Sequence, residues 1–209
     1  MITESNAKRI LLKDLNFDAP KIKKLDNFVK KLLIFNKKHN LISKNTEKQI
    51  WDRHVLDSAQ IIKFIDVKDC SGIADLGTGG GFPGIILAIY FQDFNFHVKL
   101  YEKSPVKSAF LINVSNILGL NCKIICNDIN LVKIDSNYIV CRAFRKLPYI
   151  LNISRENCKK KHKIIIMKGR NAQVEINNTS KMKNYEYRLE NSITDNDSKI
   201  IILNVGKIL

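Results

Sequence analysis

The decapeptide Asp75-Leu76-Gly77-Thr78-Gly79-Gly80-Gly81-Phe82-Pro83-Gly84 decides the fold of this chain. It closes a short apolar run, Ile73–Leu76, and opens a second apolar stretch, residues 84–91, so a strand passes into a helix through a glycine-rich turn. Glycines in such a turn supply positive φ and let the backbone approach a ligand without a Cβ in the way. Doubly wound α/β sheets bind ligands at turns of this kind. The decapeptide therefore predicts an α/β fold with a ligand site at its first turn.

Two classes of cofactor fit this glycine pattern. Gly79-x-Gly81-x-x-Gly84 matches the dinucleotide fingerprint of NAD-dependent enzymes, in which the first glycine ends the strand directly. Here the strand carries Asp75 and ends one residue later, so Gly77 forms the turn and the frame becomes acidic-x-Gly-x-Gly. This frame suits S-adenosylmethionine, which has no pyrophosphate: its amino group can face Asp75, and its amino-acid portion can lie over Gly77 and Gly79. We favour the second frame and keep the first as the alternative.

Polar residues follow the next two apolar runs as well. Glu102 ends the second run, where a carboxylate can accept both ribose hydroxyls of either cofactor. Asp128, Ile129 and Asn130 follow the third run, at a position from which an adenine edge is commonly read. We therefore expect these four residues to complete the cofactor site that the glycine turn begins.

Short apolar runs alternate with helix-length segments after Gly72, which is typical of β-α-β units around a mostly parallel sheet. The expected strands are Ile73–Leu76, Val98–Glu102, Lys123–Cys126, Tyr138–Cys141 and Lys163–Met167. The helix between the second and third begins with Ser104 as N-cap and Pro105 at its first position, and Gly119 ends it. Residues 185–193 and 199–205 flank a polar turn and predict an antiparallel hairpin. The five expected strands and the hairpin together predict a seven-stranded, mostly parallel sheet with one reversed strand.

The region before this sheet has a helical pattern. Apolar residues recur with helical spacing from Ile22 to Phe35, and lysines occupy much of the opposite face. A second helical stretch is expected from Glu47 to Phe64. We therefore expect a single domain over residues 1–209, with an N-terminal helical cap over 1–66 and an α/β core over 67–209.

The charge of the chain points to a polyanionic partner. The sequence has 35 Lys and Arg against 20 Asp and Glu, which gives a formal net charge of +15 and a pI near 9.6. Such a charge attracts nucleic acid. A general codon bias toward Lys, Ile and Asn would produce the same excess, so the charge only supports this interpretation.

Cysteine usage and hydropathy indicate the compartment. Five cysteines, Cys70, Cys122, Cys126, Cys141 and Cys158, form no C-x-x-C pair and are odd in number, which argues against a disulfide framework and against a zinc site. The segment 1–12 lacks the apolar core of a signal peptide, and the best apolar run, residues 84–91, is too short to span a bilayer. We expect a cytoplasmic protein without a metal cofactor or a membrane partner.

Sequence marks of particular methyl acceptors are missing. A cytosine C5 enzyme needs a nucleophilic Cys, commonly after Pro, and no cysteine here follows a proline. An enzyme that methylates an exocyclic amine typically carries an Asn/Asp-Pro-Pro-aromatic loop. Leu147-Pro148-Tyr149 is only partly similar, because it lacks the amide donor and the first proline. A ring nitrogen with a free lone pair, such as guanine N7, needs no base, because alignment can supply most of the rate. We expect such an acceptor and no catalytic base, with Arg142 facing the cleft to bind a cofactor carboxylate, a phosphate or the guanine edge.

Several short pieces, in order over nearly the whole chain, carry a resemblance. They are Asn40-Leu41, Arg53-His54-Val55-Leu56-Asp57-Ser58, the decapeptide with its Phe82-Pro83-Gly84 end, Lys107 with Phe110-Leu111, Arg142-Ala143-Phe144 and Lys168-Gly169. Together they resemble the bacterial family of ribosomal RNA small subunit methyltransferase G, also called RsmG or GidB. Gly80 stands where that family often has Pro, Ser or Ala, and the tail after Gly169 matches least.

The resemblance implies a Rossmann-like, class I S-adenosylmethionine-dependent methyltransferase with an N-terminal helical extension, which methylates N7 of a guanine in 16S rRNA. By position it implies cofactor contacts of Gly77, Phe82, Ile129, Asn130 and Arg142. We expect basic residues of the cap and the cleft rim to contact the RNA, namely Arg53, His54, Arg142 and Lys168.

Two alternatives from other functional classes stay open. One is an NAD-dependent oxidoreductase, which the dinucleotide fingerprint would serve. The other is a non-catalytic RNA-binding module that uses the basic surface. The sequence does not tell whether the substrate is naked rRNA, a partly assembled particle or the mature small subunit. The lack of an obvious heptad or exposed apolar stripe favours a monomer.

Overall fold

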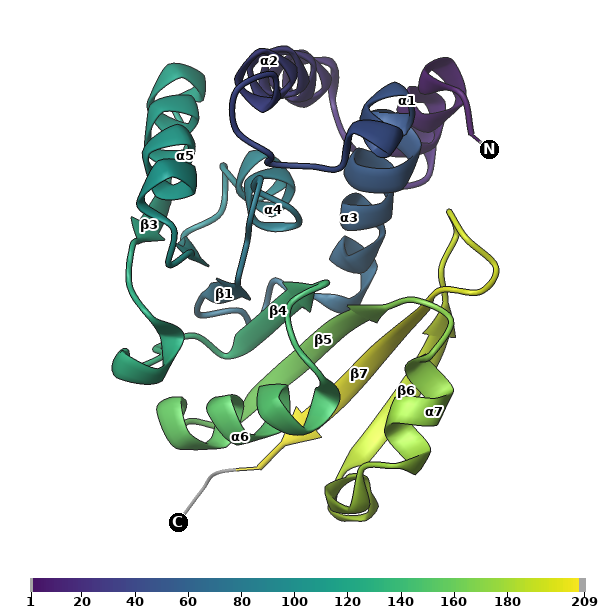
Figure 1. The fold of residues 1–209 in the computed structure, drawn as a ribbon, viewed down its shortest axis with the longest axis vertical. Coiled ribbons are helices and arrows are strands. Elements are labelled where there is room, and N and C mark those ends of the chain that lie inside the picture. The colour runs from purple at the N-terminus through teal and green to yellow at the C-terminus, as the bar shows by residue number, and fades with distance from the viewer. Residues whose placement is uncertain (1, 207–209) are drawn as a thin grey trace.

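The computed structural model describes residues 2–206, apart from the side chain of residue 181. Seven strands form one sheet with helices on both faces (Figure 1). The strands are β1 (Ile73–Leu76), β2 (Val98–Tyr101), β3 (Cys122–Ile125), β4 (Tyr138–Arg142), β5 (His162–Lys168), β6 (Glu186–Asn191) and β7 (Lys199–Val205). The α-helices are α1 (Glu4–Lys13), α2 (Ala19–Asn36), α3 (Asp57–Ala59), α4 (Gly84–Tyr90), α5 (Pro105–Leu118), α6 (Leu147–Asn157) and α7 (Ala172–Asn177). The 3-10 segments are η1 (Lys44–Gln49), η3 (Gln60–Phe64), η4 (Ile129–Leu131) and η5 (Ser180–Asn184), and η2 (Trp51–Leu56) is a π-helix.

The sheet has the strand order β3-β2-β1-β4-β5-β7-β6. Strands β1 to β5 run parallel, and β7 runs antiparallel to both of its neighbours, β5 and β6. The expected seven-stranded sheet with one reversed strand is therefore confirmed. The strand order reverses between β1 and β4, and doubly wound sheets bind ligands outside the carboxyl ends of the strands at such a point.

The strands and helices of the sheet region lie almost where local signals in the sequence predict them. Strand β1 spans residues 73–76 as predicted, and β2 to β5 differ from prediction by one residue at one or both ends. At the start of α5, Oγ of Ser104 accepts a hydrogen bond from the Lys107 N–H at 3.4 Å. Gly119 ends α5 in the left-handed conformation, with φ +59°. Capping chemistry therefore fixes both ends of the crossover between β2 and β3.

Two apolar clusters lie on opposite faces of the sheet. Tyr138 and Val140 of β4 belong to one cluster, while Ile139 and Cys141 of the same strand belong to the other. The first cluster joins α4 and α5 to the cap, and includes the fully buried Phe28 of α2; the second includes α6. Figure 1 shows α1, α2 and α3 on the same side of the sheet as α4 and α5. The cap thus shares one core with the sheet and its helices.

Two parts of the cap differ from the prediction. The sequence pattern misses α1, because Ala7 and Leu11 alone are buried in this ten-residue helix, which is too few for an apolar stripe to stand out. The stretch from Glu47 to Phe64 is helical as predicted, but only α3 has α-helical geometry within it. Sequence periodicity near 3.6 does not separate α-helix from short 3-10 or π turns, which have similar periods.

The described thiols are unpaired, and Cys141 and Cys158 are buried. Within residues 2–206 no helix is long and apolar enough to cross a membrane. Within the same part of the chain, no group of three or more His, Cys, Asp and Glu side chains is placed to hold a metal ion.

Candidate active site

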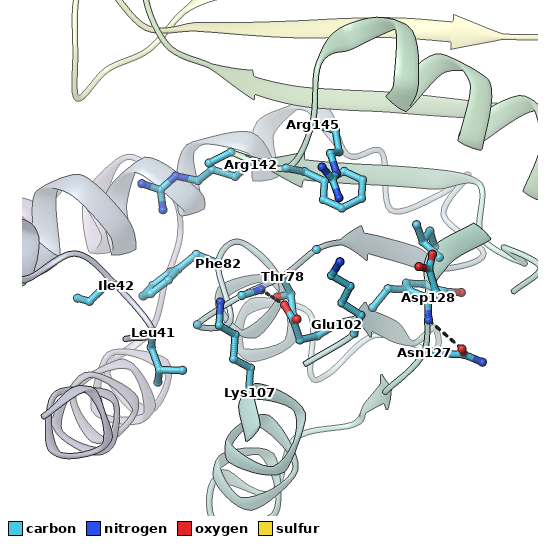
Figure 2. Close-up of a pocket in the computed structure, with 18 of the residues that line it drawn as sticks. Leu41, Ile42, Thr78, Phe82, Glu102, Lys107, Asn127, Asp128, Arg142 and Arg145 are labelled. Carbon is cyan, nitrogen blue, oxygen red and sulfur yellow. Dashed lines mark hydrogen bonds between the residues drawn. The ribbon is translucent and has the colours of Figure 1, made fainter. Parts of the chain in front are cut away.

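A cavity of about 430 Å³ opens at the carboxyl ends of β1, β2, β3 and β4 (Figure 2). Among the residues that the sequence assigns to cofactor or RNA, those that line it are His54, Gly77, Gly79, Phe82, Glu102, Asp128, Ile129, Asn130 and Arg142. Asp75, Arg53 and Lys168 lie outside this lining. One hollow therefore brings together residues from four strand ends and from the cap.

The glycine turn has a backbone that other residues adopt only with strain. Gly77 has φ +69° and Gly81 has φ +99°. A Cβ on Gly77 would lie 2.2 Å from Cδ2 of Phe144, and a Cβ on Gly81 would lie 2.7 Å from Cγ1 of Ile85. The turn is therefore packed against a wall of the cavity on one side and against the core on the other.

Asp75 lies beneath this turn and is fully buried. Its Oδ2 accepts a hydrogen bond from the Gly84 N–H at 2.7 Å, which ties the start of α4 to β1. A Cβ on Gly84 would lie 2.6 Å from that oxygen, so glycine is needed for the approach. Burial raises the pKa of Asp75 to about 7. The carboxyl group of Asp75 thus helps to fix the shape of the glycine turn.

Glu102 holds the turn from the side of β2. Its Oε2 accepts from the Gly79 N–H at 3.0 Å, and its Oε1 accepts from the Ser104 N–H at 2.8 Å. A carboxylate has about four acceptor positions, so each oxygen keeps a lone pair for a ligand. The side chain reaches the cavity although the residue is only 8% exposed.

The segment after β3 forms the opposite end of the cavity. Oδ1 of Asp128 accepts hydrogen bonds from the backbone N–H of Asn130 at 3.0 Å and from its side-chain amide at 2.6 Å. These two bonds, and the charges of Lys103 and Arg145 after them, lower the pKa of Asp128. Oδ1 of Asn130 in turn accepts from the Tyr149 hydroxyl at 3.0 Å. The segment therefore presents an ionised carboxylate held in a fixed orientation.

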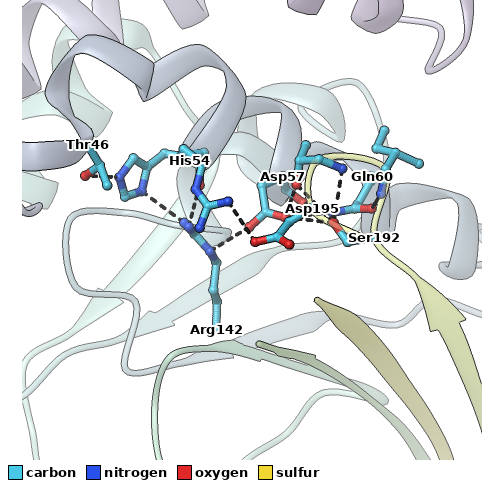
Figure 3. Close-up of polar contacts among 10 residues, drawn as sticks. Thr46, His54, Asp57, Gln60, Arg142, Ser192 and Asp195 are labelled. Carbon is cyan, nitrogen blue, oxygen red and sulfur yellow. Dashed lines mark hydrogen bonds and ion pairs between the residues drawn. The ribbon is translucent and has the colours of Figure 1, made fainter. Parts of the chain in front are cut away.

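Arg142, the last residue of β4, is bound to the cap (Figure 3). Its Nε donates to Oδ2 of Asp57 at 2.9 Å, and one terminal nitrogen donates to Nδ1 of His54 at 3.1 Å. The other terminal nitrogen donates to the backbone oxygen of Arg53. The Arg142 side chain is 20% exposed. All three guanidinium nitrogens therefore have partners on one turn of the cap.

His54 is neutral and has a defined tautomer. Because an arginine can only donate, Nδ1 of His54 accepts from Arg142, and the proton lies on Nε2, 2.8 Å from Oγ1 of Thr46. Burial, together with the nearby charges of Arg142 and Arg53, lowers the pKa of His54 to about 3. Its ring packs against Phe82 with centroids 5.0 Å apart. The two rings form the wall of the cavity nearest the cap.

Asp57 connects the same junction to the turn between β6 and β7. Its Oδ1 accepts from Oγ1 of Thr194 at 2.8 Å and from the Gln60 amide at 2.8 Å, and Gln60 accepts from the Ile193 N–H at 2.9 Å (Figure 3). Ser192 also contacts this carboxylate, at 3.3 Å. Three distant segments of the chain therefore meet at one carboxylate.

Arg53 and Lys168 lie in a neighbouring hollow of about 220 Å³ that shares Arg142 with the main cavity. Arg53 pairs with Asp195 at 2.8 Å. Lys168 pairs with Glu175 at 2.8 Å. The structure thus places both near the cavity, with their charges already paired.

The cavity has further lining residues to which the sequence assigns no role. They include Leu41, Ile42, Thr78, Lys103, Lys107, Phe144, Arg145 and Tyr149. Lys103 and Arg145 follow the ends of β2 and β4 closely, and this position at the ligand-binding edge of a parallel sheet is the signal that could have found them.

Comparisons with known proteins agree on one family. The model of the GidB family, rRNA small subunit methyltransferase G, matches residues 21–200. The ribosomal RNA small subunit methyltransferase G of Pelagibacter ubique (strain HTCC1062) is 38% identical over 203 residues, which cover 95% of this chain and 94% of that protein.

Solved structures share the fold at low sequence identity. A mutant of MtNAS in complex with S-adenosylmethionine superposes with a TM-score of 0.58 at 14% identity, and the match covers 98% of this chain and 84% of that one. The methyltransferase yhhF from Escherichia coli has a TM-score of 0.57 at 15% identity, over 75% of this chain and 90% of that one. These likenesses concern the Rossmann-like fold of class I methyltransferases. The family is shown by the sequence matches over most of the chain, and this protein belongs to the rRNA small subunit methyltransferase G family.

Proposed function

We propose that this protein transfers a methyl group from S-adenosylmethionine to N7 of a guanine in the 16S rRNA of the small ribosomal subunit. The observation that carries the proposal is the cavity, into which the glycine turn after β1, Glu102 after β2 and residues 128–130 after β3 all face. Membership of a family of rRNA small subunit methyltransferases supports the reaction and the class of substrate. It also favours the methyltransferase frame of the glycine turn over the dinucleotide frame and over a non-catalytic RNA-binding role.

The cavity fits S-adenosylmethionine in three parts. Gly77 and Gly79 leave room for the amino-acid portion, and Glu102 keeps lone pairs for the ribose hydroxyls. The segment of Asp128, Ile129 and Asn130 offers polar groups to the edge of the adenine and an apolar side chain to its face. When bound, the cofactor supplies a methyl group on an electrophilic sulfonium.

Three other residues assigned to the cofactor shape the cavity. Asp75 accepts the Gly84 N–H beneath the turn, and Arg142 holds the cap over the sheet. Phe82 packs between His54 and Phe28, with ring centroids 5.0 and 5.3 Å away. We assign these three to positioning. Contacts of Arg53, His54 and Lys168 with RNA stay a prediction.

A ring nitrogen is the methyl acceptor that requires the fewest catalytic groups from this cavity. Guanine N7 has a free lone pair, so no group has to remove a proton, and alignment with the methyl group supplies most of the rate. Glu102 already accepts two backbone N–H groups, and Nδ1 of His54 already accepts from Arg142. We therefore assign no general base to the site.

The proposal includes a setting for the reaction. We place the protein in the cytoplasm and take it to act as a monomer, because the cavity is complete within one chain. Its partner is 16S rRNA, either free or within a small subunit.

Transfer of labelled methyl from S-adenosylmethionine to small subunits without their native modifications tests the proposal. We expect one labelled N7-methylguanine in 16S rRNA. Glu102→Ala should abolish most of the transfer and weaken cofactor binding. Lys159→Gln, which lies just before the amino end of β5 and away from the cavity, should do neither. A label on another atom of the RNA would overturn the N7 assignment. Thermal protection by NADH and not by S-adenosylmethionine would overturn the reaction itself.

A further inference from the structure

The charges that the sequence assigns to RNA already have partners inside the protein. Arg53, Arg142 and Lys168 each pair with a carboxylate of this chain, at N···O distances of 2.8, 2.9 and 2.8 Å. His54 is uncharged at neutral pH, because its pKa is lowered to about 3 by burial and by two arginines. An RNA phosphate would have to displace a carboxylate from each paired cation. Positive charge at the cavity that is not already paired therefore comes from other residues.

Six further basic residues, which line the cavity or lie close in the chain to residues that do, have no such partners. Lys37 and Lys38 follow α2, Lys103 follows β2, Lys107 lies in the first turn of α5, and Arg145 and Lys146 follow β4; we call these six residues the basic rim. Within residues 2–206 no carboxylate forms an ion pair with any of them. All except Lys107 are exposed. The basic rim thus presents positive charge that is not held in an ion pair.

Both sides of the basic rim lie at the cavity. Lys103, Lys107 and Arg145 line it, and Figure 2 shows Lys107 and Arg145 on opposite sides of the hollow. The segment after Lys38 reaches the cavity through Leu41. That segment has a fixed course, because Oδ1 of Asn36 accepts the N–H groups of the next turn at 2.7 and 2.9 Å.

Two acidic groups at the cavity offset part of this charge. The carboxylates of Glu102 and Asp128 line the cavity together with Lys103, Lys107 and Arg145. After the hydrogen bonds within its own loop, the charges of Lys103 and Arg145 lower the pKa of Asp128. Three cations of the basic rim thus stand against two carboxylates in the lining. At the amino end of β5, Lys160 pairs with Asp135, while the neighbouring Lys159 and Lys161 form no ion pair within residues 2–206. Unpaired positive charge therefore occurs elsewhere on the described surface as well, and the basic rim is distinguished by its place at the cavity.

Flat rings accompany the cations. The Arg145 guanidinium lies over the ring of Tyr149, 5.6 Å from its centroid, and Tyr149 meets Phe144 edge to face at 6.1 Å. Proteins that bind unpaired RNA combine basic side chains with aromatic surfaces on which bases stack. Because the lining of the cavity includes the residues proposed to hold the cofactor, the methyl group would be presented within it, and a target nucleotide has to leave its stack to reach that group.

We propose that the basic rim binds the phosphates on either side of the target nucleotide, and that its ligand is unpaired RNA. This inference rests on the proposed function, because it takes the methyl acceptor to be RNA. Lys37 and Lys38 on one side and Arg145 and Lys146 on the other bind the backbone as it enters and leaves, while the base between them faces the cavity.

Matched double variants test the proposal, because each removes two positive charges. Lys37→Gln with Lys38→Gln, and separately Lys103→Gln with Arg145→Gln, change the basic rim. Lys159→Gln with Lys161→Gln is the control, since both lysines are exposed and lie beside the paired Lys160, at the amino end of β5. The probe is a single-stranded oligonucleotide with a 16S rRNA sequence, compared with its duplex, over a range of salt.

Each rim variant should weaken binding of the single strand by about tenfold or more near ~0.1 M salt, and should reduce the slope of log affinity against log salt by about 1.4. The control should change both much less, and the duplex should bind more weakly than the single strand. Equal losses in rim and control variants, or a preference for the duplex, would overturn the proposal.

Two further measurements separate this inference from the proposed function. Cofactor affinity of the Lys37→Gln, Lys38→Gln variant should equal that of the wild type, because neither lysine lines the cavity. If RNA binding depends on the basic rim but no methyl group is transferred, the rim stands and the proposed function fails. If methyl transfer occurs and the rim variants bind and react like the control, the rim assignment fails alone.

Discussion

Gly77 shows how one added carbon atom can close this site. A Cβ there would lie 2.2 Å from the ring of Phe144, and its φ of +69° is unfavourable for any other residue. Gly77→Ala should therefore lower the free energy of unfolding by about 1–3 kcal/mol. It should also weaken S-adenosylmethionine binding, because the turn and Phe144 have to move apart. Urea titration and calorimetric binding measure the two effects.

Gly169→Ala is the control for this prediction. A Cβ there meets no heavy atom within 4 Å. Its free energy of unfolding should change by less than about 0.5 kcal/mol. Similar effects of the two substitutions would show that the crowding at Gly77 has no energetic cost.

The neutral state of His54 predicts a dependence of stability on pH. Its pKa is about 3 in the folded protein and near 6.5 in the unfolded chain, so the unfolded chain binds more protons between these values. Protonation then stabilises the unfolded chain, and the free energy of unfolding falls by up to about 1.4 kcal/mol per pH unit as pH drops below 6.5. Asp75 acts in the opposite direction, because its raised pKa makes the folded protein bind more protons between pH 7 and 3.8.

Comparison of the wild type with His54→Gln isolates the histidine. The variant should be less stable at pH 7, where it loses the hydrogen bonds of the ring, and the difference should shrink as pH falls toward 4. Urea unfolding at several pH values measures this. A difference that stays constant with pH would mean that the pKa of His54 is the same in the folded protein and in the unfolded chain.

At the scale of elements, the junction between β4 and the cap should contribute much of the stability. Arg142 and Asp57 are 20% and 15% exposed, and their ion pair is surrounded by further hydrogen bonds. Loss of one partner leaves the other charge poorly solvated, so Arg142→Met should lower the free energy of unfolding by about 2–4 kcal/mol. A double-mutant cycle with Asp57→Asn should give a coupling energy above about 1 kcal/mol.

The pair of Arg53 and Asp195 provides the comparison, because it is more open, with side chains 42% and 27% exposed. Its coupling energy should be below about 1 kcal/mol. A coupling at the Arg142 pair no larger than this would remove its assigned role in holding the cap. In that case Arg142 would be free to serve the ligand directly.

Elements with strong local signals could be predicted from the sequence, and those without could not. The run Ile73–Leu76 and the signals at Ser104 and Gly119 mark β1 and α5 because each acts within a few residues. Helix α1 has too little buried surface to leave a pattern. The cavity could be predicted for a similar reason, since residues that follow parallel strands meet at one edge. The partner of Arg142, Asp57, could not, because the pairing joins β4 to the cap, far away in the chain.

On the scale of the whole molecule, the shared core predicts that cap and sheet unfold together. Trp51, the one tryptophan of the sequence, is buried in the cap and reports on it by fluorescence, whereas circular dichroism reports on the sheet and helices as a whole. We propose one folding unit, so both signals should change at the same urea concentration. A change in Trp51 fluorescence at a lower urea concentration would show that the cap unfolds before the α/β core, with a boundary near residue 66.

Phe28→Ala extends this prediction, because the residue belongs to the cap but packs against Phe82 and Phe110 of the core, with ring centroids 5.3 and 6.5 Å away. The substitution should lower the free energy of unfolding by about 3–5 kcal/mol. It should shift the fluorescence and circular dichroism transitions equally. A shift of the fluorescence transition alone would contradict a common core.

The order of the last strands has a consequence for folding during synthesis. Strand β7 lies between β5 and β6, although it is translated after both. Until it emerges, β5 keeps an open hydrogen-bonding edge and β6 has no strand to pair with, and such edges invite contact with other chains. The same delay applies to the cap, because the hydrogen bonds from Ser192 and Thr194 to Asp57 form only when the hairpin closes. A nascent chain of this protein is therefore most exposed to aggregation late in translation, when most of the sheet is already built.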